Sequence, residues 1–195
     1  MNNKTTIIIA SNNAGKIKEL QQMLGELYEV KGMREAGFNL NPEENASDFK
    51  GNALIKAEAL SELTDDIVVA DDSGLCCEAL NGAPGVITAR YAGENATNEE
   101  NVKKLLADLK GKPNRKAHFV CSIALIRNNL PYIFEGKVDG EITESVCGEG
   151  GFGYDPVFKP IGWNKTFAES TSEEKNSISH RAKAVQKMVQ FLLAE

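Results

Sequence analysis

Residues 6–20 read TIIIASNNAGKIKEL, and this stretch decides the fold class. The apolar run that ends at Ala10 predicts a fully buried β-strand. Apolar residues at spacings of three and four from Ile17 onward predict an amphipathic helix directly after it. The two are joined by a small polar turn, residues 11–16. A strand that enters a helix in this way is typical of α/β proteins, and the first backbone N–H groups of such a helix favour a bound phosphate.

Two further apolar runs predict the rest of a central sheet. DIVVA (66–70) predicts a second buried strand, which we expect to stop at the polar residues Asp71-Asp72-Ser73-Gly74. AHFVCSIALIR (117–127) is apolar on both faces and predicts a central strand, which the pair Asn128-Asn129 turns back into an antiparallel partner. Because parallel and antiparallel pairs are both expected, the sheet should be mixed.

Amphipathic stripes predict helices between and after these strands. Ser47 is the expected cap of one helix, and the capping box Thr97-x-x-Glu100 marks the start of another. A stripe from Ala182 to Leu192 predicts a helix that closes the chain. No repeat or long linker divides the sequence. We therefore predict an α/β fold in a single, bilobal domain over residues 1–195, with a mixed central β-sheet flanked by helices.

Composition limits the classes of function. The chain has 195 residues, of which 42% are apolar and 26% charged, enough for a core without disulfides. A net charge of −6 disfavours a nucleic acid polymer as partner, whereas a small phosphorylated ligand is compatible with it. No apolar run approaches the roughly 20 residues of a membrane span, and no secretory signal opens the chain, so we expect a cytoplasmic protein without a membrane partner.

The cysteines and histidines do not form a recognisable metal site. The four cysteines show no C-x-x-C spacing, and the chain has only two histidines, so zinc is disfavoured. Cys76 and Cys77 could form a redox pair, although adjacent cysteines rarely form a disulfide and buried thiols are the commoner case.

The turn at residues 11–16 is a candidate phosphate site. It does not match the P-loop, because Ala10 and Ile17 stand where that pattern needs Gly and Ser or Thr. Backbone N–H groups at the helix start, the helix dipole and the Lys16 ammonium would nevertheless favour a phosphate. The alternative is a plain turn in which Asn13 caps the helix and Lys16 lies in solvent.

Two acidic pairs are candidate metal ligands. Asp71 and Asp72 follow a buried strand, where α/β sheets usually place their sites, and Mg²⁺ prefers one or two carboxylates together with phosphate oxygens. The alternative is that Asp72 caps a turn. Glu43 and Glu44 lie in a predicted loop, where solvated charge is the ordinary interpretation.

Two C-terminal segments could recognise a base. The glycine-rich segment 148–156 carries Phe152 and Tyr154, whose flat rings suit a base, although a packed glycine-rich hairpin would have the same composition. Lys175 and Ser179-His180-Arg181 gather several donors near the start of the last helix. A capping Ser with a surface Arg is the alternative.

In combination these segments resemble one family, the inosine/xanthosine triphosphate pyrophosphatases, which hydrolyse non-standard purine nucleoside triphosphates. The resemblance covers residues 7 to about 190. It rests on SNNAGK (11–16), FKGNALIKA (49–57), VVADDSGL (68–75), GAPGVITARYAG (82–93), GGFGYDPVF (150–158) and EEKNSISHRAKA (173–184). It implies a nucleotide cleft between two lobes, a homodimer, Mg²⁺ as cofactor and a role in cleansing the nucleotide pool.

The resemblance also implies roles for individual residues. In the opening turn Ser11, Asn13, Gly15 and Lys16 match the family pattern, and Asn12 stands where the family usually has Gly. In the acidic loop the family's acidic pair, Phe and Asn-Ala are retained, so Glu43 or Glu44 should bind the metal. Asn45-Ala46 and Gly51 depart from the pattern. The implied phosphate and substrate contacts are Ser11, Asn12, Asn13, Ala14, Gly15, Lys16, Asn52 and Ser73.

Catalysis and base recognition follow from the same resemblance. Asp72 would activate the attacking water and hold Mg²⁺, while Lys16 and the metal would take the charge on the pyrophosphate leaving group. The implied nucleotide pocket comprises Phe152, Gly153, Tyr154, Asp155, Lys175, His180 and Arg181. Donors from His180 and Arg181 would pair with a 6-oxo group. The open alternatives are a pyrophosphatase for pyrimidine or other modified nucleotides, and a nucleotide-binding sensor without turnover.

Overall fold

The structure, a computed structural model, describes residues 4–194, which divide into two compact units. Of the described residues, unit 1 takes 4–72, 121–136 and 181–194, and unit 2 takes 73–120 and 137–180. The strands follow one another in a single six-stranded sheet in the order β2-β1-β3-β4-β5-β6. Among the described residues, no helix is both long enough and apolar enough to cross a membrane.

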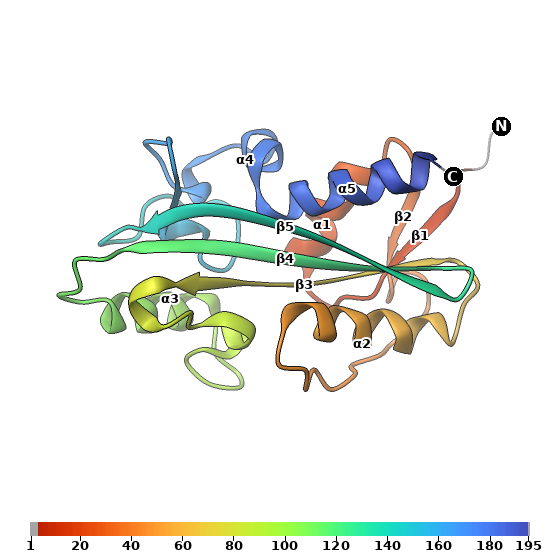
Figure 1. The fold of residues 1–195 in the computed structure, drawn as a ribbon, viewed down its shortest axis with the longest axis horizontal. Coiled ribbons are helices and arrows are strands. Elements are labelled where there is room, and N and C mark those ends of the chain that lie inside the picture. Colours follow the sequence, from red (N-terminus) through yellow and green to blue (C-terminus); the bar gives the residue numbers. More distant parts are fainter. Residues whose placement is uncertain (1–3, 195) are drawn as a thin grey trace. The chain divides into compact units, whose positions relative to one another are not determined.

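Unit 1 has three layers. Strand β1 pairs in parallel with both β2 and β3. Helices α1 and α5 cover one face of the strands, and α2 covers the other (Figure 1). The elements that contribute to this unit are β1 (Thr6–Ile9), α1 (Ala14–Leu24), β2 (Glu29–Gly32), α2 (Phe49–Ser61), β3 (Ile67–Cys77), β4 (Lys116–Arg127), β5 (Leu130–Ile142) and α5 (His180–Ala194).

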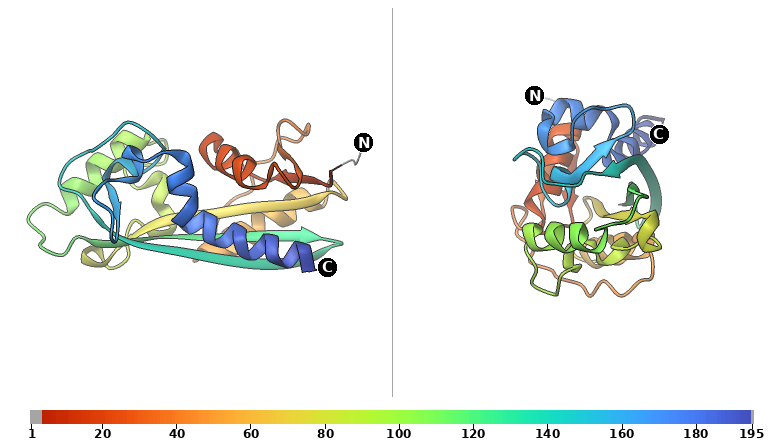
Figure 2. Two further views of the ribbon diagram at one scale, coloured as in Figure 1. Left: turned by 90° about the horizontal axis from the view of Figure 1, so that it is seen from above. Right: turned by 90° about the vertical axis from the view of Figure 1, so that its left-hand side faces the viewer.

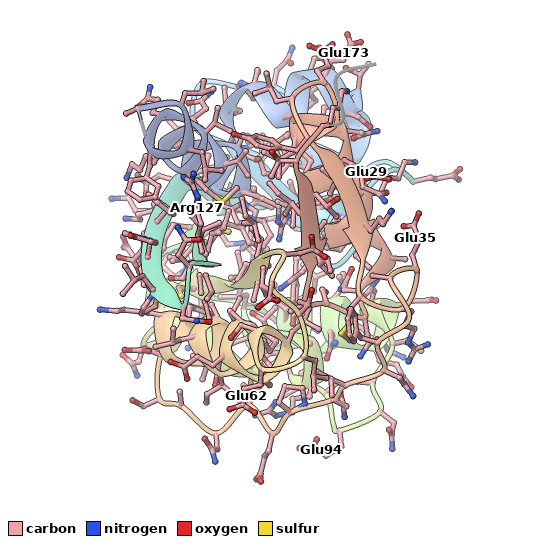
Figure 3. All side chains as sticks on the ribbon, turned by 90° about the vertical axis from the view of Figure 1, so that its right-hand side faces the viewer. Glu29, Glu35, Glu62, Glu94, Arg127 and Glu173 are labelled. Carbon is pink, nitrogen blue, oxygen red and sulfur yellow. The ribbon has the colours of Figure 1, made fainter. Side chains whose placement is uncertain are left out.

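The alternation of side chains along β1 produces the two cores of unit 1. Ile7 and Ile9 pack with Leu20 of α1 and Met188 of α5, and these two helices lie over the same face of the sheet (Figure 2). Ile8 and Ala10 point the other way, into a core with the alanines and Leu60 of α2. Figure 3 draws the side chains of the chain and labels, in this unit, Arg127 at the end of β4 and Glu62 just after α2.

Unit 2 is built on the remaining parts of the long strands. Its core contains Leu75, Leu105, Phe119, Phe158 and Phe167, with nine-tenths or more of each residue buried. Strand β6 pairs antiparallel with β5, which makes the sheet mixed, as predicted. The helices and strand that belong to unit 2 alone are η1 (Glu78–Leu80), η2 (Gly85–Arg90), α3 (Asn98–Asp108), η3 (Asp155–Val157), β6 (Phe158–Pro160), η4 (Phe167–Glu169) and α4 (Ser172–Ile178).

Several local predictions are confirmed. The Thr97–Glu100 capping box starts α3. Asn128 and Asn129 have φ values of 53° and 60°, the left-handed conformation that a two-residue hairpin turn needs. Among the described non-glycine residues, Asn81 is the only other one with positive φ, so Asn12 adopts an ordinary conformation where the family has Gly.

Other boundaries were predicted wrongly. The strand that should stop at Asp71 continues as β3 to Cys77, because Asp71 and Asp72 are buried in the sheet instead of turning into solvent. Asp48, not Ser47, caps α2, since its Oδ1 accepts from Gly51 N at 2.7 Å. Strand β2 was not predicted, and neither was α4, a separate short helix before α5.

Candidate active site

The turn before α1 is held by its own side chains. Asn13 Oδ1 accepts from Lys16 N at 3.1 Å, and Ser11 Oγ accepts from Asn13 N at 3.1 Å. Asn12 Nδ2 donates to Leu40 O at 3.1 Å. Asn12, Asn13 and Ala14 are exposed and Gly15 is half-buried, so the start of α1 is accessible to a ligand. The helix cap that the plain alternative required is therefore present, at a helix start that can also receive a phosphate.

The Lys16 side chain does not lie in solvent. Its Nζ is 2.6 Å from Asp71 Oδ1, and the Asp71 side chain is fully buried. Arg181 contacts the same carboxylate, with Nε 2.9 Å from Oδ2. Although burial opposes ionisation, the charges of Arg181 and Lys16 hold the pKa of Asp71 well below its usual range. Asp71 is thus an anion at neutral pH that holds the Lys16 ammonium, whose charge also acts on Asp72.

Asp72 is the second carboxylate of this cluster, and its environment differs. Burial raises its pKa, against the opposing charges of Lys56 and Lys16. Lys56 Nζ lies 3.5 Å from Asp72 Oδ1 and 2.9 Å from Glu44 Oε2. A buried carboxylate with a raised pKa is a stronger base than an exposed one, which suits proton abstraction from water.

The two glutamates of the acidic loop lie in different environments. Glu44 is half-buried and reaches Lys56, whereas Glu43 is exposed. Asn52, 3% exposed on α2, accepts from Ala46 N at 2.9 Å and so anchors the segment that follows the acidic pair. Asn52 thus contacts the loop backbone, and its expected contact with the substrate stays a prediction.

The residues of unit 1 fit a divalent cation. Asp72 Oδ2 is buried and has no hydrogen-bond partner among the described residues, so one carboxylate oxygen remains for a ligand. No group of three or more His, Cys, Asp or Glu side chains in the described part of the chain is arranged to hold a metal. Asp72 and Glu44 would supply two ligands, which is the number Mg²⁺ takes from a protein when phosphate oxygens and water complete its shell.

Unit 2 contains a second charged cluster beside aromatic rings. Lys175 Nζ lies 2.6 Å from Asp155 Oδ2, and their side chains are 6% and 3% exposed. Asp155 Oδ2 also accepts from Phe152 N at 3.0 Å, and the Lys175 ammonium lies 4.7 Å from the Phe152 ring centroid. Phe152 is only partly buried, so it can offer a face to a base.

The other predicted residues of unit 2 occupy different environments. Tyr154 is 3% exposed and donates its hydroxyl to Thr88 O at 2.7 Å, so its ring belongs to the core. Gly153 has a φ of 60°, which only glycine adopts readily, and is partly buried. His180 is buried and stacks on Phe119, with ring centroids 4.7 Å apart. Ser73 is half-buried in β3, directly after Asp72.

Arg181 was assigned to the base, and that role stays a prediction. In the structure its side chain is 1% exposed and contacts Glu19 and Asp71, both in unit 1. Sequence reasoning missed Glu19, Lys56 and Cys121 as members of the site. The signal for two of them was helical spacing, because Glu19 lies three residues after Lys16 and Lys56 lies four residues after Asn52.

Comparison with known proteins identifies the family. A family model described as the Ham1 family matches residues 7–191. The chain belongs to the Ham1 family. This Ham1 family member is 46% identical over 191 residues to a dITP/XTP pyrophosphatase of Bacillus subtilis, with 96% of each chain covered. It is 47% identical over 190 residues to a protein of the same name from Thermoanaerobacter pseudethanolicus, again with 96% of each chain covered.

Solved structures of the Ham1 family share the fold. The Ham1 protein of Staphylococcus aureus matches with a TM-score of 0.86 and 42% identity, over 97% of this chain and 99% of the other. A HAM1 protein of Coxiella burnetii matches with a TM-score of 0.88 and 40% identity, over 98% of this chain and 100% of the other. The α/β fold with a mixed sheet is therefore that of the family.

Proposed function

We propose that the protein is a Mg²⁺-dependent pyrophosphatase that hydrolyses ITP, dITP, XTP and dXTP to the nucleoside monophosphate and pyrophosphate. One observation carries the proposal: the Lys16 ammonium at the start of α1 lies 2.6 Å from Asp71, and the residue that follows Asp71 in β3 is the buried Asp72. A helix start that can receive a phosphate and a buried carboxylate with a raised pKa thus belong to the same unit. The name dITP/XTP pyrophosphatase of the B. subtilis relative supports the same chemistry.

The reaction is a displacement by water at the α–β phosphate bond, in which the protein contributes mainly positioning and charge. The turn at residues 11–16 would receive phosphate oxygens through the first N–H groups of α1, including those of Ala14 and Gly15. Asp72 would orient the water and accept its proton, and burial, which raises the pKa of Asp72, increases its strength as a base.

The phosphate charge would be neutralised by two lysines of unit 1 and by the metal. Lys16 would stabilise the charge that develops on the pyrophosphate leaving group. Lys56, between Glu44 and Asp72, is a further cation of the same site. Asp72 and Glu44 would hold Mg²⁺, which when bound acts as a Lewis acid on the phosphate oxygens.

Unit 2 would select the base. A 6-oxo purine presents an acceptor where adenine presents an amino donor. Donors such as the Lys175 ammonium and His180 match the oxo group and leave the adenine amine unpaired, which costs about 1–3 kcal/mol for each buried mismatch. Phe152 offers the partly exposed ring on which a base can stack.

We also propose that the protein is a cytoplasmic homodimer whose partner is the small nucleotide itself. The family resemblance carries this part of the proposal. The net charge of −6 supports a small phosphorylated ligand over a nucleic acid polymer.

A substrate panel tests the proposal. Initial rates of pyrophosphate release are measured for ITP, XTP, GTP, ATP and dUTP, with and without Mg²⁺. We expect kcat/KM for ITP and XTP to exceed that for ATP and GTP at least tenfold, and activity to require the metal. A preference for dUTP would show instead that the substrates are pyrimidine nucleotides. Binding of ITP without pyrophosphate release would make the protein a sensor.

A further inference from the structure

The Asp71 carboxylate lies in a buried cluster that the proposed chemistry does not fully use. Its Oδ1 faces Lys16 Nζ at 2.6 Å, and its Oδ2 accepts from Arg181 Nε at 2.9 Å. Arg181 Nη2 also donates to Oδ1 at 3.3 Å. Cys121 Sγ lies 2.8 Å from Oδ2. Three chain segments, α1, β4 and α5, therefore place a donor on one carboxylate of β3.

The two oxygens of Asp71 have different neighbours, and this difference affects how the carboxylate is oriented. The terminal torsion of an aspartate side chain is broad, so its carboxylate rotates easily unless donors hold both oxygens. Cys121 Sγ donates to Oδ2, whereas the Lys16 ammonium lies 2.6 Å from Oδ1. A donor that fixes the position of Oδ2 therefore also fixes Oδ1, and with it the position of the Lys16 ammonium.

The environment of Cys121 keeps its thiol a donor. The residue is fully buried on β4, in the core cluster that also contains Ile123 and Val69. Burial and the neighbouring Asp71 charge hold the pKa of Cys121 well above its usual value, so the proton stays on sulfur. A buried, protonated thiol is neither a nucleophile nor a metal ligand. Its remaining chemical capability is the hydrogen bond to Asp71.

We propose that Cys121 is a positioning residue for the hydrolysis: its thiol, together with the Arg181 guanidinium, sets the orientation of Asp71 and thereby the position of the Lys16 ammonium. The inference rests on the proposed function, because the position of Lys16 matters only if Lys16 acts on the leaving group. Cys121 itself touches neither the water nor the phosphates.

Three variants separate positioning from packing. Cys121→Ala removes the donor, Cys121→Ser keeps a donor of similar size, and Ile123→Val is the matched control, because it removes a methylene from the same core cluster without touching Asp71. We expect Cys121→Ala to lower kcat for ITP about tenfold with KM nearly unchanged, since the misplaced ammonium acts in the transition state. Cys121→Ser should restore most of kcat, and Ile123→Val should leave it near the wild-type value.

A second measurement reports on the bond without activity. The infrared S–H stretching band that disappears in Cys121→Ala belongs to this thiol. We expect this band to shift in Asp71→Asn, because the charged acceptor is lost. An unshifted band overturns the inference, as does a Cys121→Ala enzyme with unchanged kcat or a Cys121→Ser enzyme as impaired as Cys121→Ala. A wild-type protein that releases no pyrophosphate from ITP or XTP instead refutes the proposed function.

Discussion

Replacement of Asp155 by asparagine should destabilise the protein strongly, because it removes the carboxylate next to a buried ammonium. Lys175 Nζ and Asp155 Oδ2 are 2.6 Å apart, and the two side chains are 6% and 3% exposed. At that distance two unit charges attract by about 6 kcal/mol at an effective dielectric constant near 20. Removal of one partner of such a pair costs about 3–5 kcal/mol, since the other charge stays buried.

The melting temperature converts this cost into an observable. In a chain of this length, each kcal/mol shifts the melting temperature by about 2–4 °C, so Asp155→Asn should lower it by about 6–20 °C. The assay is thermal unfolding without nucleotide, checked by urea unfolding. The double variant with Lys175→Met should recover much of the loss, because it removes the stranded charge as well.

An exposed ion pair that includes Glu174 of α4, the helix that also carries Lys175, provides the control. Lys165 Nζ lies 2.7 Å from Glu174 Oε2, but these side chains are 34% and 43% exposed. Solvent screens such a pair, so Lys165→Met should cost less than about 1 kcal/mol. If Asp155→Asn melts as close to the wild type as Lys165→Met does, the argument from buried charge is refuted.

Three further variants test unit 1. Asp72→Asn should lower kcat by about 10²–10⁴-fold, as for loss of a general base. It should not lower the melting temperature, because burial already disfavours the charged carboxylate and raises its pKa. Near-normal pyrophosphate release by this variant would refute the role of Asp72. Lys16→Ala should weaken competitive binding of ITP about tenfold and that of inosine monophosphate much less, and an equal loss for both would contradict a phosphate cradle. The pKa of Asp71 is lowered in the folded protein. Its contribution to the free energy of unfolding is therefore complete above about pH 4, the pKa range of an unfolded carboxyl, and is lost as the pH falls through the pKa of the folded state. The loss of unfolding free energy in Asp71→Asn should therefore be greatest near neutral pH and shrink on acidification, and urea titrations that show it growing would reverse the argument.

Local sequence patterns predicted much of unit 1. The buried strand, the turn and the helix at residues 6–20 form as expected, because hydrophobic periodicity and an Asn cap are local signals. Strand β2 lacked such a signal. It has four residues, two of them the charged Glu29 and Lys31, and its pairing with β1 is a long-range interaction.

The site itself was predicted in part, for a related reason. The types and order of the residues predicted Lys16 and Asp72 as members of the site. The residues that contact them are far away in the sequence and are known only from the structure. Arg181 lies 110 residues after Asp71, so no local pattern connects them. Glu44 is distinguished from Glu43 only by its contact with Lys56 of α2. The buried donor Cys121 looked in sequence like an ordinary residue of an apolar strand.

The products formed from ITP test the central claim most directly. The protein is incubated with ITP and Mg²⁺, and the products are identified and quantified by mass spectrometry. We predict inosine monophosphate and pyrophosphate in equal amounts, and the same two products from Asp72→Asn at a rate about 10²–10⁴-fold lower. Inosine diphosphate with orthophosphate would place the cleavage at the wrong phosphate bond and contradict the roles given to Lys16 and Asp72.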